Sequence, residues 1–271
     1  MDERLAANRE RWDERVAIHV ASDFYDVDAF KRGRPAIQPF EVEELGPLDG
    51  MRLVHLQCHF GLDTLDIARL HPTVSVTGVD FSPLAIEAAK RLAVEVRLTG
   101  RSDFVCADVY HAVDALDHAR FAAVYTGKGA LNWLPDLDRW ASVVHELLEP
   151  GGFLYLSEFH PVAAVLADDA PVPELDYFSS EPIFSEDAAG SDAAPDVPTE
   201  HNASYEWQHP LSRVITAVLR AGLVLELFHE WDFTLFHRVP YLVRGSDGRT
   251  RWRGPGTLPL MYSLKARRPA R

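Results

Sequence analysis

Short apolar runs alternate with amphipathic stretches over the first 160 residues. Five runs are apolar or β-branched and four to seven residues long, which predicts buried strands: residues 51–56 (MRLVHL), 74–79 (VSVTGV), 104–107, 121–125 (FAAVY) and 153–159 (FLYLSEF). Three stretches between them are typical of helices: residues 62–70, 82–92 and 136–148. Strands separated by helices need crossover connections, so the pattern predicts a largely parallel sheet covered on both faces.

The ends of the chain extend this α/β pattern. Residues 211–221 predict a further helix, and residues 223–230 and 258–266 predict two more strands. No helix is expected between these two strands, so they should pair antiparallel in a doubly wound, mostly parallel, seven-stranded sheet. Residues 3–20 predict an N-terminal amphipathic helix. We therefore divide the chain into a helical cap (1–45), a core (46–160), an acidic insertion (161–208) and a C-terminal part of the same sheet (209–271).

Charge is distributed unevenly along the chain. The 41 acidic and 27 basic residues give a net charge of −14, which argues against binding to nucleic-acid phosphates. Between Arg139 and Arg213 there are 14 acids and no lysine or arginine. Residues 185–204 are small, polar, acidic and proline-bearing, which predicts a mobile loop; the aromatic residues around it suggest a lid over an acceptor. The acidity of this lid either aids solubility or attracts a cationic acceptor.

The composition also bears on the cellular setting. Two cysteines, Cys58 and Cys106, exclude a disulfide-rich scaffold. The N-terminus lacks the apolar run of a signal peptide, and no stretch approaches 18 uncharged apolar residues. We therefore expect a cytoplasmic protein with no membrane span, as a monomer or homodimer. Residues 213–271 hold 11 basic and four acidic residues, an excess that either pairs with the acidic insertion or forms a dimer surface.

Polar residues follow the expected strands at the edge where open parallel sheets bind ligands. Asp80 ends the second strand, 19 residues after Gly61, and can accept hydrogen bonds from both hydroxyls of a ribose. A dinucleotide cofactor and S-adenosylmethionine both contain such a ribose. Gln57 and His59 stand where a GxGxxG loop has glycines, which leaves little room for a pyrophosphate. Asp108, after the third strand, is placed for an adenine amino group.

Four segments resemble the motifs of class I S-adenosylmethionine-dependent methyltransferases, in that family's order and spacing. They are residues 53–61 (LVHLQCHFG), 79–82 (VDFS), 106–109 (CADV) and 148–152 (LEPGG). Residues 55–61 and 129–137 (GALNWLPDL) are similar to a mostly bacterial subgroup of that family. The resemblance implies a Rossmann-like fold with a reversed last strand, and S-adenosylmethionine as cofactor with S-adenosylhomocysteine as product. It also implies methyl transfer to an O, N or S atom of a small molecule.

The resemblance also indicates site residues. The expected cofactor-binding residues are Tyr25, Gln57, Cys58, Gly61, Asp80, Phe81, Ser82, Asp108, Val109 and Thr126. Gln57 is expected to contact the methionine part through its side-chain amide. The expected substrate-binding residues are Asn132, Trp133, His160 and His237, with His160 as the candidate base because histidine titrates near neutral pH.

Other interpretations remain open from the residues alone. Asp80 and Asp108 could simply cap helices, and His160-Pro161 could simply end a strand. No CxxC spacing supports a metal site, and none is expected. The alternative functions are a dinucleotide-dependent oxidoreductase, a non-catalytic protein that binds or senses S-adenosylmethionine, and an enzyme that uses this cofactor for chemistry other than methyl transfer.

Overall fold

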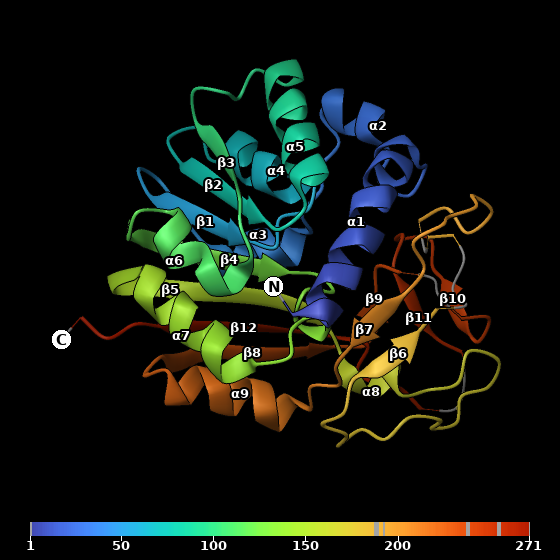
Figure 1. Ribbon diagram of the computed structural model, residues 1–271. Coiled ribbons are helices and arrows are strands. Elements are labelled where there is room, and N and C mark those ends of the chain that lie inside the picture. The colour runs from blue at the N-terminus through green and yellow to red at the C-terminus, as the bar shows by residue number, and fades with distance from the viewer. Residues whose placement is uncertain (1, 187–189, 192, 237–238, 254–255, 271) are drawn as a thin grey trace.

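The computed structural model describes residues 2–186, 190–191, 193–236, 239–253 and 256–270. Its centre is a seven-stranded sheet in the order β3-β2-β1-β4-β5-β12-β8 (Figure 1). The strands are β1 (Arg52–Leu56), β2 (Ser75–Asp80), β3 (Ser102–Cys106), β4 (Phe121–Gly127), β5 (Leu148–Phe159), β8 (Val224–Trp231) and β12 (Met261–Arg267). Only β12 runs antiparallel to its neighbours, β5 and β8. This confirms the predicted doubly wound fold with a reversed last strand.

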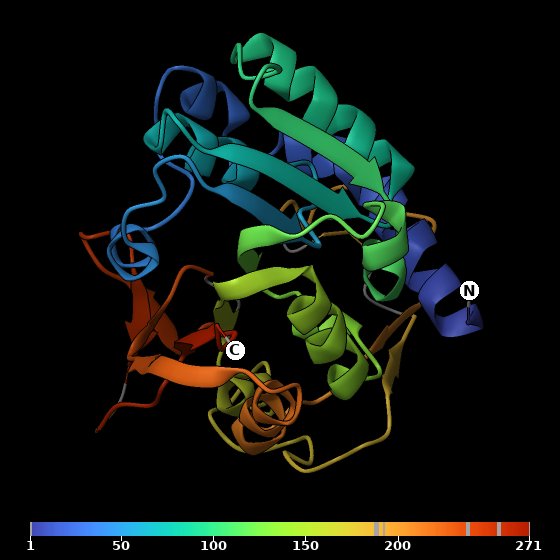
Figure 2. The same cartoon turned by 90° about the vertical axis from the view of Figure 1, so that its left-hand side faces the viewer.

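Helices cover both faces of the sheet, as Figure 2 shows. One face carries α3 (Pro39–Leu45), α4 (Leu62–Leu70) and α5 (Pro83–Glu95); the other carries α6 (Ala112–Ala115), α7 (Leu137–Leu147) and α9 (Leu211–Arg220). A separate apolar core fills each interface. Phe60, Leu65 and Phe104 belong to the first, and Trp140 and Val214 to the second. Two apolar layers on one sheet explain why the central strands read as continuous apolar runs.

Local signals fixed several boundaries. The side chain of Ser82 accepts a hydrogen bond from Ala85 N at 3.0 Å, and Pro83 takes the first position of α5, as predicted. Helix α7 (Leu137–Leu147) ends within one residue of its predicted end, but β5 begins at Leu148 and not at the predicted residue 153. Phe121 pairs with Leu148 and Ala123 with Phe153, so residues 149–152 form a bulge inside the strand. Gly151 adopts a φ of 81° there, which glycine tolerates without steric cost.

Several elements gather at the carboxyl edge of the parallel strands, on the right of Figure 1. They are α1 (Glu3–Ala21), α2 (Val27–Lys31), α8 (Pro161–Ala164), the antiparallel pair β6 (Ile183–Ser185) and β7 (Ser204–Glu206), and a three-stranded sheet of β9 (Phe233–Thr234), β10 (Leu242–Arg244) and β11 (Thr250–Trp252). The strand pattern predicted neither small sheet. Strands of two or three residues are too short to show an alternation of apolar and polar side chains.

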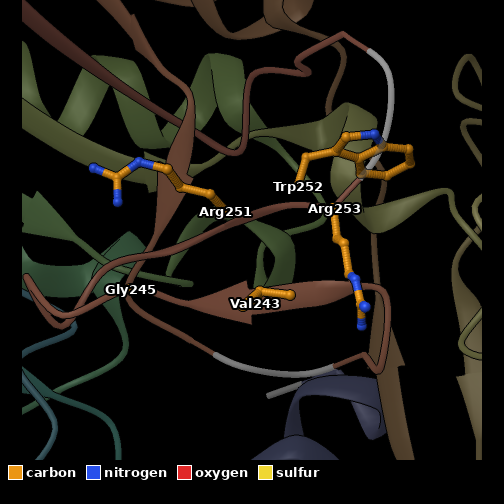
Figure 3. Close-up of a pocket in the computed structure, with 5 residues that line it drawn as sticks. All are labelled: Val243, Gly245, Arg251, Trp252 and Arg253. Atoms are coloured by element: carbon orange, nitrogen blue, oxygen red, sulfur yellow. The ribbon is translucent and has the colours of Figure 1, made fainter.

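The three-stranded sheet carries a cavity of about 560 Å³. It is lined by Val243, Gly245, Arg251, Trp252 and Arg253 (Figure 3). The guanidinium of Arg251 is paired with Asp247 at 2.8 Å and also lies near Asp232. This cavity therefore lies on β10 and β11, whereas the predicted cofactor-binding residues lie on or beside the central sheet. Within the described ranges, no helix has the length and apolar character needed to cross a bilayer.

Candidate functional site

The loops after β1, β2 and β4 are tied together at the carboxyl edge of the sheet. Asp80, the last residue of β2, accepts a hydrogen bond from His59 N at 2.8 Å and another from Ser82 N at 2.9 Å. Gln57 Nε2 donates to the carbonyl of Ala130, after β4, at 2.8 Å. The side chains predicted from separate motifs therefore share one site, placed where parallel sheets bind ligands.

The loop after β1 keeps a glycine-type backbone although two of its glycines are replaced. Gln57 has a φ of 58°, His59 of 49° and Gly61 of 77°. For residues other than glycine this left-handed conformation costs about 1–2 kcal/mol each. Gly61 has a further constraint, because a Cβ atom there would lie 2.6 Å from the ring of Phe104. Strain of this kind persists where surrounding structure enforces it, and it concentrates at functional sites.

Gln57 also carries a buried atom that lacks a partner. Within the described part of the chain, its Oε1 atom accepts no hydrogen bond, while its Nε2 atom is held by Ala130. Leaving such an acceptor unsatisfied costs about 1–3 kcal/mol, so its presence calls for an explanation. An ammonium group of a bound ligand would supply the missing donor. The methionine part of S-adenosylmethionine carries such a group, and the site therefore fits this cofactor.

Asp80, the residue predicted to bind the ribose, is buried and bonded to backbone amides. Its carboxylate is 7% exposed, and each of its oxygens accepts one backbone hydrogen bond. Because a carboxylate can accept about four hydrogen bonds, two sites remain for the two ribose hydroxyls. Burial raises the pKa of Asp80 to about 6, despite the opposing hydrogen bonds from Ser82 and His59.

This raised pKa predicts a pH-dependent affinity. Ribose hydroxyls donate to an ionised carboxylate, so binding should weaken as Asp80 becomes protonated below pH 6. We expect the dissociation constant of S-adenosylhomocysteine to rise about tenfold between pH 7 and pH 5. Calorimetric titration at half-unit pH steps would measure it. Asp80→Asn, which cannot titrate, should bind weakly with no step in this range; a wild-type affinity that stays constant would contradict the prediction.

Helix α1 lies across this edge of the sheet (Figure 1). The ring of Trp12 packs edge-on against His59 at 5.2 Å and Trp133 at 5.3 Å between centroids. His19 Nδ1 lies 2.9 Å from His59 Nε2. Burial lowers the pKa of His19 to about 4 and also lowers that of His59, so both rings are neutral at pH 7 and one donates to the other. Tyr25 packs on Phe60 at 4.9 Å, which extends this cover.

The acidic insertion is bonded to α1. Asn8 donates to the carbonyl of Tyr205 and accepts from its amide, both at 2.8 Å. Arg15 is 3% exposed and donates to the carbonyls of Gly190 at 2.7 Å and His201 at 3.0 Å. The composition predicted a mobile loop over residues 185–204, whereas in the described part of this segment these hydrogen bonds join it to α1. The insertion therefore holds α1 over the loop after β1.

Several predicted cofactor residues also have structural roles. Asp108 accepts from Tyr110 N at 2.9 Å and begins the 3-10 turn η1 (Val109–His111), as the capping alternative proposed. Ser82 caps α5 and donates to Asp13 of α1. Cys58 is buried and packs back on β2, since a Cβ atom on Gly78 would lie 2.7 Å from its sulfur. The remaining predicted residues lie at the same edge: Phe81 follows β2, Val109 is buried at the start of η1, and Thr126 is fully buried near the end of β4.

The predicted substrate residues divide into two groups. Asn132 and Trp133 lie in the 3-10 turn η2 (Leu131–Trp133), where Asn132 Nδ2 donates to Glu206 at 2.8 Å. They join the loop after β4 to the insertion and to α1. His160, in contrast, begins α8 and is 4% exposed. His237 lies outside the described residues.

Both ring nitrogens of His160 have partners. Nδ1 accepts from Val162 N at 3.1 Å, so Nε2 carries the proton and donates to Glu230 at 3.0 Å. Burial lowers the pKa of His160, although Glu230 opposes this shift. These contacts favour the helix-start interpretation, and a role for His160 as base stays a prediction.

The sequence did not predict the contacts of two charged residues, Glu158 and Lys128. Glu158, near the end of β5, is 4% exposed and accepts only backbone hydrogen bonds among its described contacts. Lys128, after β4, lies 3.0 Å from carboxylate oxygens of both Glu41 and Asp63. Burial alone would lower the pKa of Lys128. The two carboxylates raise this pKa by more than burial lowers it, so Lys128 stays cationic. Glu158 could have been noticed in the sequence as an acid inside an otherwise apolar strand. Lys128 could not, because its partners Glu41 and Asp63 are distant from it in the sequence.

The chain resembles known proteins in its sequence over the core of the sheet. Residues 54–152 match a family described as a methyltransferase domain. Over 113 residues the chain is 36% identical to a carboxy-S-adenosyl-L-methionine synthase of Chromohalobacter salexigens. That alignment covers 40% of this chain and 40% of the relative, so it spans two fifths of the length of that protein.

Solved structures share the whole fold. An S-adenosylmethionine-dependent methyltransferase from Mesorhizobium loti has a TM-score of 0.55 at 18% identity, covering 88% of this chain and all of that one (100%). A glycopeptide N-methyltransferase complexed with S-adenosylmethionine has a TM-score of 0.54 at 19% identity, covering 92% of this chain and 95% of that one. Residues 54–152 of this chain therefore match a methyltransferase domain, and the chain shares the fold of solved S-adenosylmethionine-dependent methyltransferases.

Proposed function

We propose that this protein transfers the methyl group of S-adenosylmethionine to an O, N or S atom of a small-molecule acceptor. The observation that carries the proposal is the buried Asp80 carboxylate at the end of β2, hydrogen-bonded to the left-handed loop that contains Gln57. A pyrophosphate cofactor is disfavoured because Gln57 and His59 keep their side chains at positions where a dinucleotide loop needs glycines.

In this proposal the chain binds and orients the cofactor and the acceptor, and it excludes water from the site. When bound, the cofactor supplies an activated sulfonium methyl group. Asp80 would accept the ribose hydroxyls, Asp108 would contact the adenine, and Gln57 Oε1 would accept from the ammonium group. Trp12 and Tyr25 cover the same edge, which would keep water from the reaction. Such an arrangement accelerates a displacement mainly through proximity and orientation.

Calorimetric titration tests the cofactor assignment first. We expect micromolar binding of S-adenosylmethionine and S-adenosylhomocysteine, and none of nicotinamide dinucleotides. Incubation with methyl-labelled cofactor and fractionated small-molecule extracts would then identify an acceptor. Binding of a dinucleotide alone would overturn the proposal. Binding of the adenosyl ligands with no labelled product would support the non-catalytic sensing alternative.

Gln57→Ala tests the contact with the methionine part. We expect its affinity for S-adenosylmethionine to fall about tenfold, because one hydrogen bond to a charged group is lost. The affinity for 5′-methylthioadenosine, which lacks the ammonium and carboxylate groups, should stay unchanged. Calorimetry with both ligands separates a direct contact from a general loosening of the loop. Equal losses for both ligands, or no loss for either, would contradict the assignment.

A second candidate function uses the same cofactor without transferring its methyl group. The observation in its favour is the similarity to a relative named as a synthase of carboxy-S-adenosyl-L-methionine. The two functions differ in what is formed from the cofactor. Mass spectrometry of the adenosyl products distinguishes them, since methyl transfer yields S-adenosylhomocysteine whereas a modifying enzyme yields a heavier sulfonium compound.

A further inference from the structure

Glu158 is a buried carboxylate with four backbone amides as hydrogen-bond donors. Its Oε1 atom accepts from Ala130 N at 2.6 Å and Leu131 N at 2.9 Å. Its Oε2 atom accepts from Gly129 N at 2.6 Å and Phe159 N at 3.1 Å. Four hydrogen bonds match the accepting capacity of a carboxylate. The negative charge is therefore compensated by backbone dipoles of the loop after β4, which wraps around it.

The segment held by Glu158, residues 129–133, contacts three other parts of the site. Its Ala130 carbonyl accepts from Gln57 Nε2 at 2.8 Å, in the loop after β1. Its Asn132 bonds to Glu206 of the insertion at 2.8 Å. Its Trp133 packs against Trp12 of α1 at 5.3 Å. Segment 129–133 therefore links the loop after β1, the insertion and α1.

We propose that Glu158 is a positioning residue of the proposed methyl-transfer site, and that it acts through segment 129–133. By fixing the Ala130 carbonyl, it orients the amide of Gln57 so that the unpartnered Oε1 atom faces the ammonium group of the cofactor. This inference rests on the proposed function. Glu158 itself contacts no reacting atom and needs only to stay ionised, since a protonated carboxyl would replace one acceptor by a donor.

A double-mutant cycle tests this chain of contacts. Glu158→Gln puts an amide NH₂ against backbone N–H groups, which should free segment 129–133. We expect the affinity for S-adenosylhomocysteine to fall about tenfold, as one charged hydrogen bond through Gln57 is lost. In the Gln57→Ala background the same substitution should change affinity less than twofold, because the relayed contact is already absent. 5′-Methylthioadenosine should bind equally well to all four proteins.

Asp66 offers a matched control. Its carboxylate is fully buried (0% exposed) and accepts from Ala36 N at 2.6 Å and Ile37 N at 3.0 Å, but it lies on α4, outside this network. Asp66→Asn should lower the melting temperature without changing the affinity for S-adenosylhomocysteine. If Glu158→Gln behaves in the same way, or if its effect persists in the Gln57→Ala background, the positioning role is wrong.

Two further measurements keep the test decisive. Should Glu158→Gln fail to fold, Glu158→Asp keeps the charge on a shorter arm and can enter the same cycle. In the wild-type protein, the amides of Gly129 and Ala130 should exchange slowly with deuterium, although neither lies in a helix or strand; rapid exchange would overturn the proposal. Failure of the proposed function can be told apart from failure of the positioning role. In the first case the wild-type protein itself would not bind S-adenosylhomocysteine.

Discussion

Asp80→Ala is expected to weaken the binding of S-adenosylmethionine and S-adenosylhomocysteine by at least about 100-fold. The two ribose hydroxyls would lose charged hydrogen bonds worth about 1.5–3 kcal/mol each, and every 1.4 kcal/mol is a factor of ten. The variant also loses the carboxylate that joins His59 N to Ser82 N, so the loop after β1 becomes less ordered in the free protein. Calorimetric titration of the variant measures this loss.

Asp103 provides the control for Asp80. It lies on the neighbouring strand β3, is exposed, and its carboxylate accepts a hydrogen bond from Phe104 N at 2.8 Å. Asp103→Ala should bind both adenosyl ligands as the wild-type protein does. A variant at Asp80 that is folded by circular dichroism and retains wild-type affinity would remove the main support for the assigned cofactor.

Arg15→Ala is expected to lower the free energy of unfolding by about 3 kcal/mol. The guanidinium is almost fully buried, and besides the carbonyls of Arg11, Gly190 and His201 it reaches Asn202 Oδ1 at 3.2 Å. Its removal leaves several acceptors between α1 and the insertion without a donor, each costing about 1–3 kcal/mol unless water replaces it. For a chain of this size the melting temperature should fall by roughly 6–10 °C.

Thermal denaturation followed by circular dichroism measures the effect. Arg32, an exposed residue at the end of α2, is the control, and Arg32→Ala should change the stability by less than about 0.5 kcal/mol. Limited proteolysis adds a local readout, since residues 199–206 should be cleaved faster once Arg15 no longer holds them to α1. An unchanged melting temperature and cleavage rate would show that these contacts contribute little.

The insertion and α1 together also suggest how ligands reach the site. Helix α1 contacts His59 through Trp12 and His19, and it is also bonded to described residues of the insertion, among them Gly190, Ser191 and Tyr205. We expect exchange of the proposed cofactor to involve a movement of α1 and of the insertion bonded to it. Weakening Arg15 should accordingly speed the dissociation of S-adenosylhomocysteine as well as lower stability.

The sequence alone determined the framework of this protein. Apolar runs and helical spacing located the strands and helices of the central sheet, because long buried elements need a continuous apolar face. The order of those elements implied a parallel sheet, and the ligand-binding edge of such a sheet is fixed by strand direction. Asp80 and Asp108 could be placed at that edge because both directly follow a strand.

Only the tertiary structure decided how that edge is built. The left-handed conformations of Gln57 and His59 are unfavourable locally, so no local rule predicts them. Hydrogen bonds from His59 N to the Asp80 carboxylate and from Gln57 Nε2 to the Ala130 carbonyl hold the loop in place. The packing of α1 against the described part of the insertion depends on contacts between segments nearly 200 residues apart, such as Asn8 with Tyr205. Glu158 likewise gains its role from amides nearly 30 residues away in sequence. A sequence displays local periodicity, whereas hydrogen bonds between distant segments form only once the chain has folded.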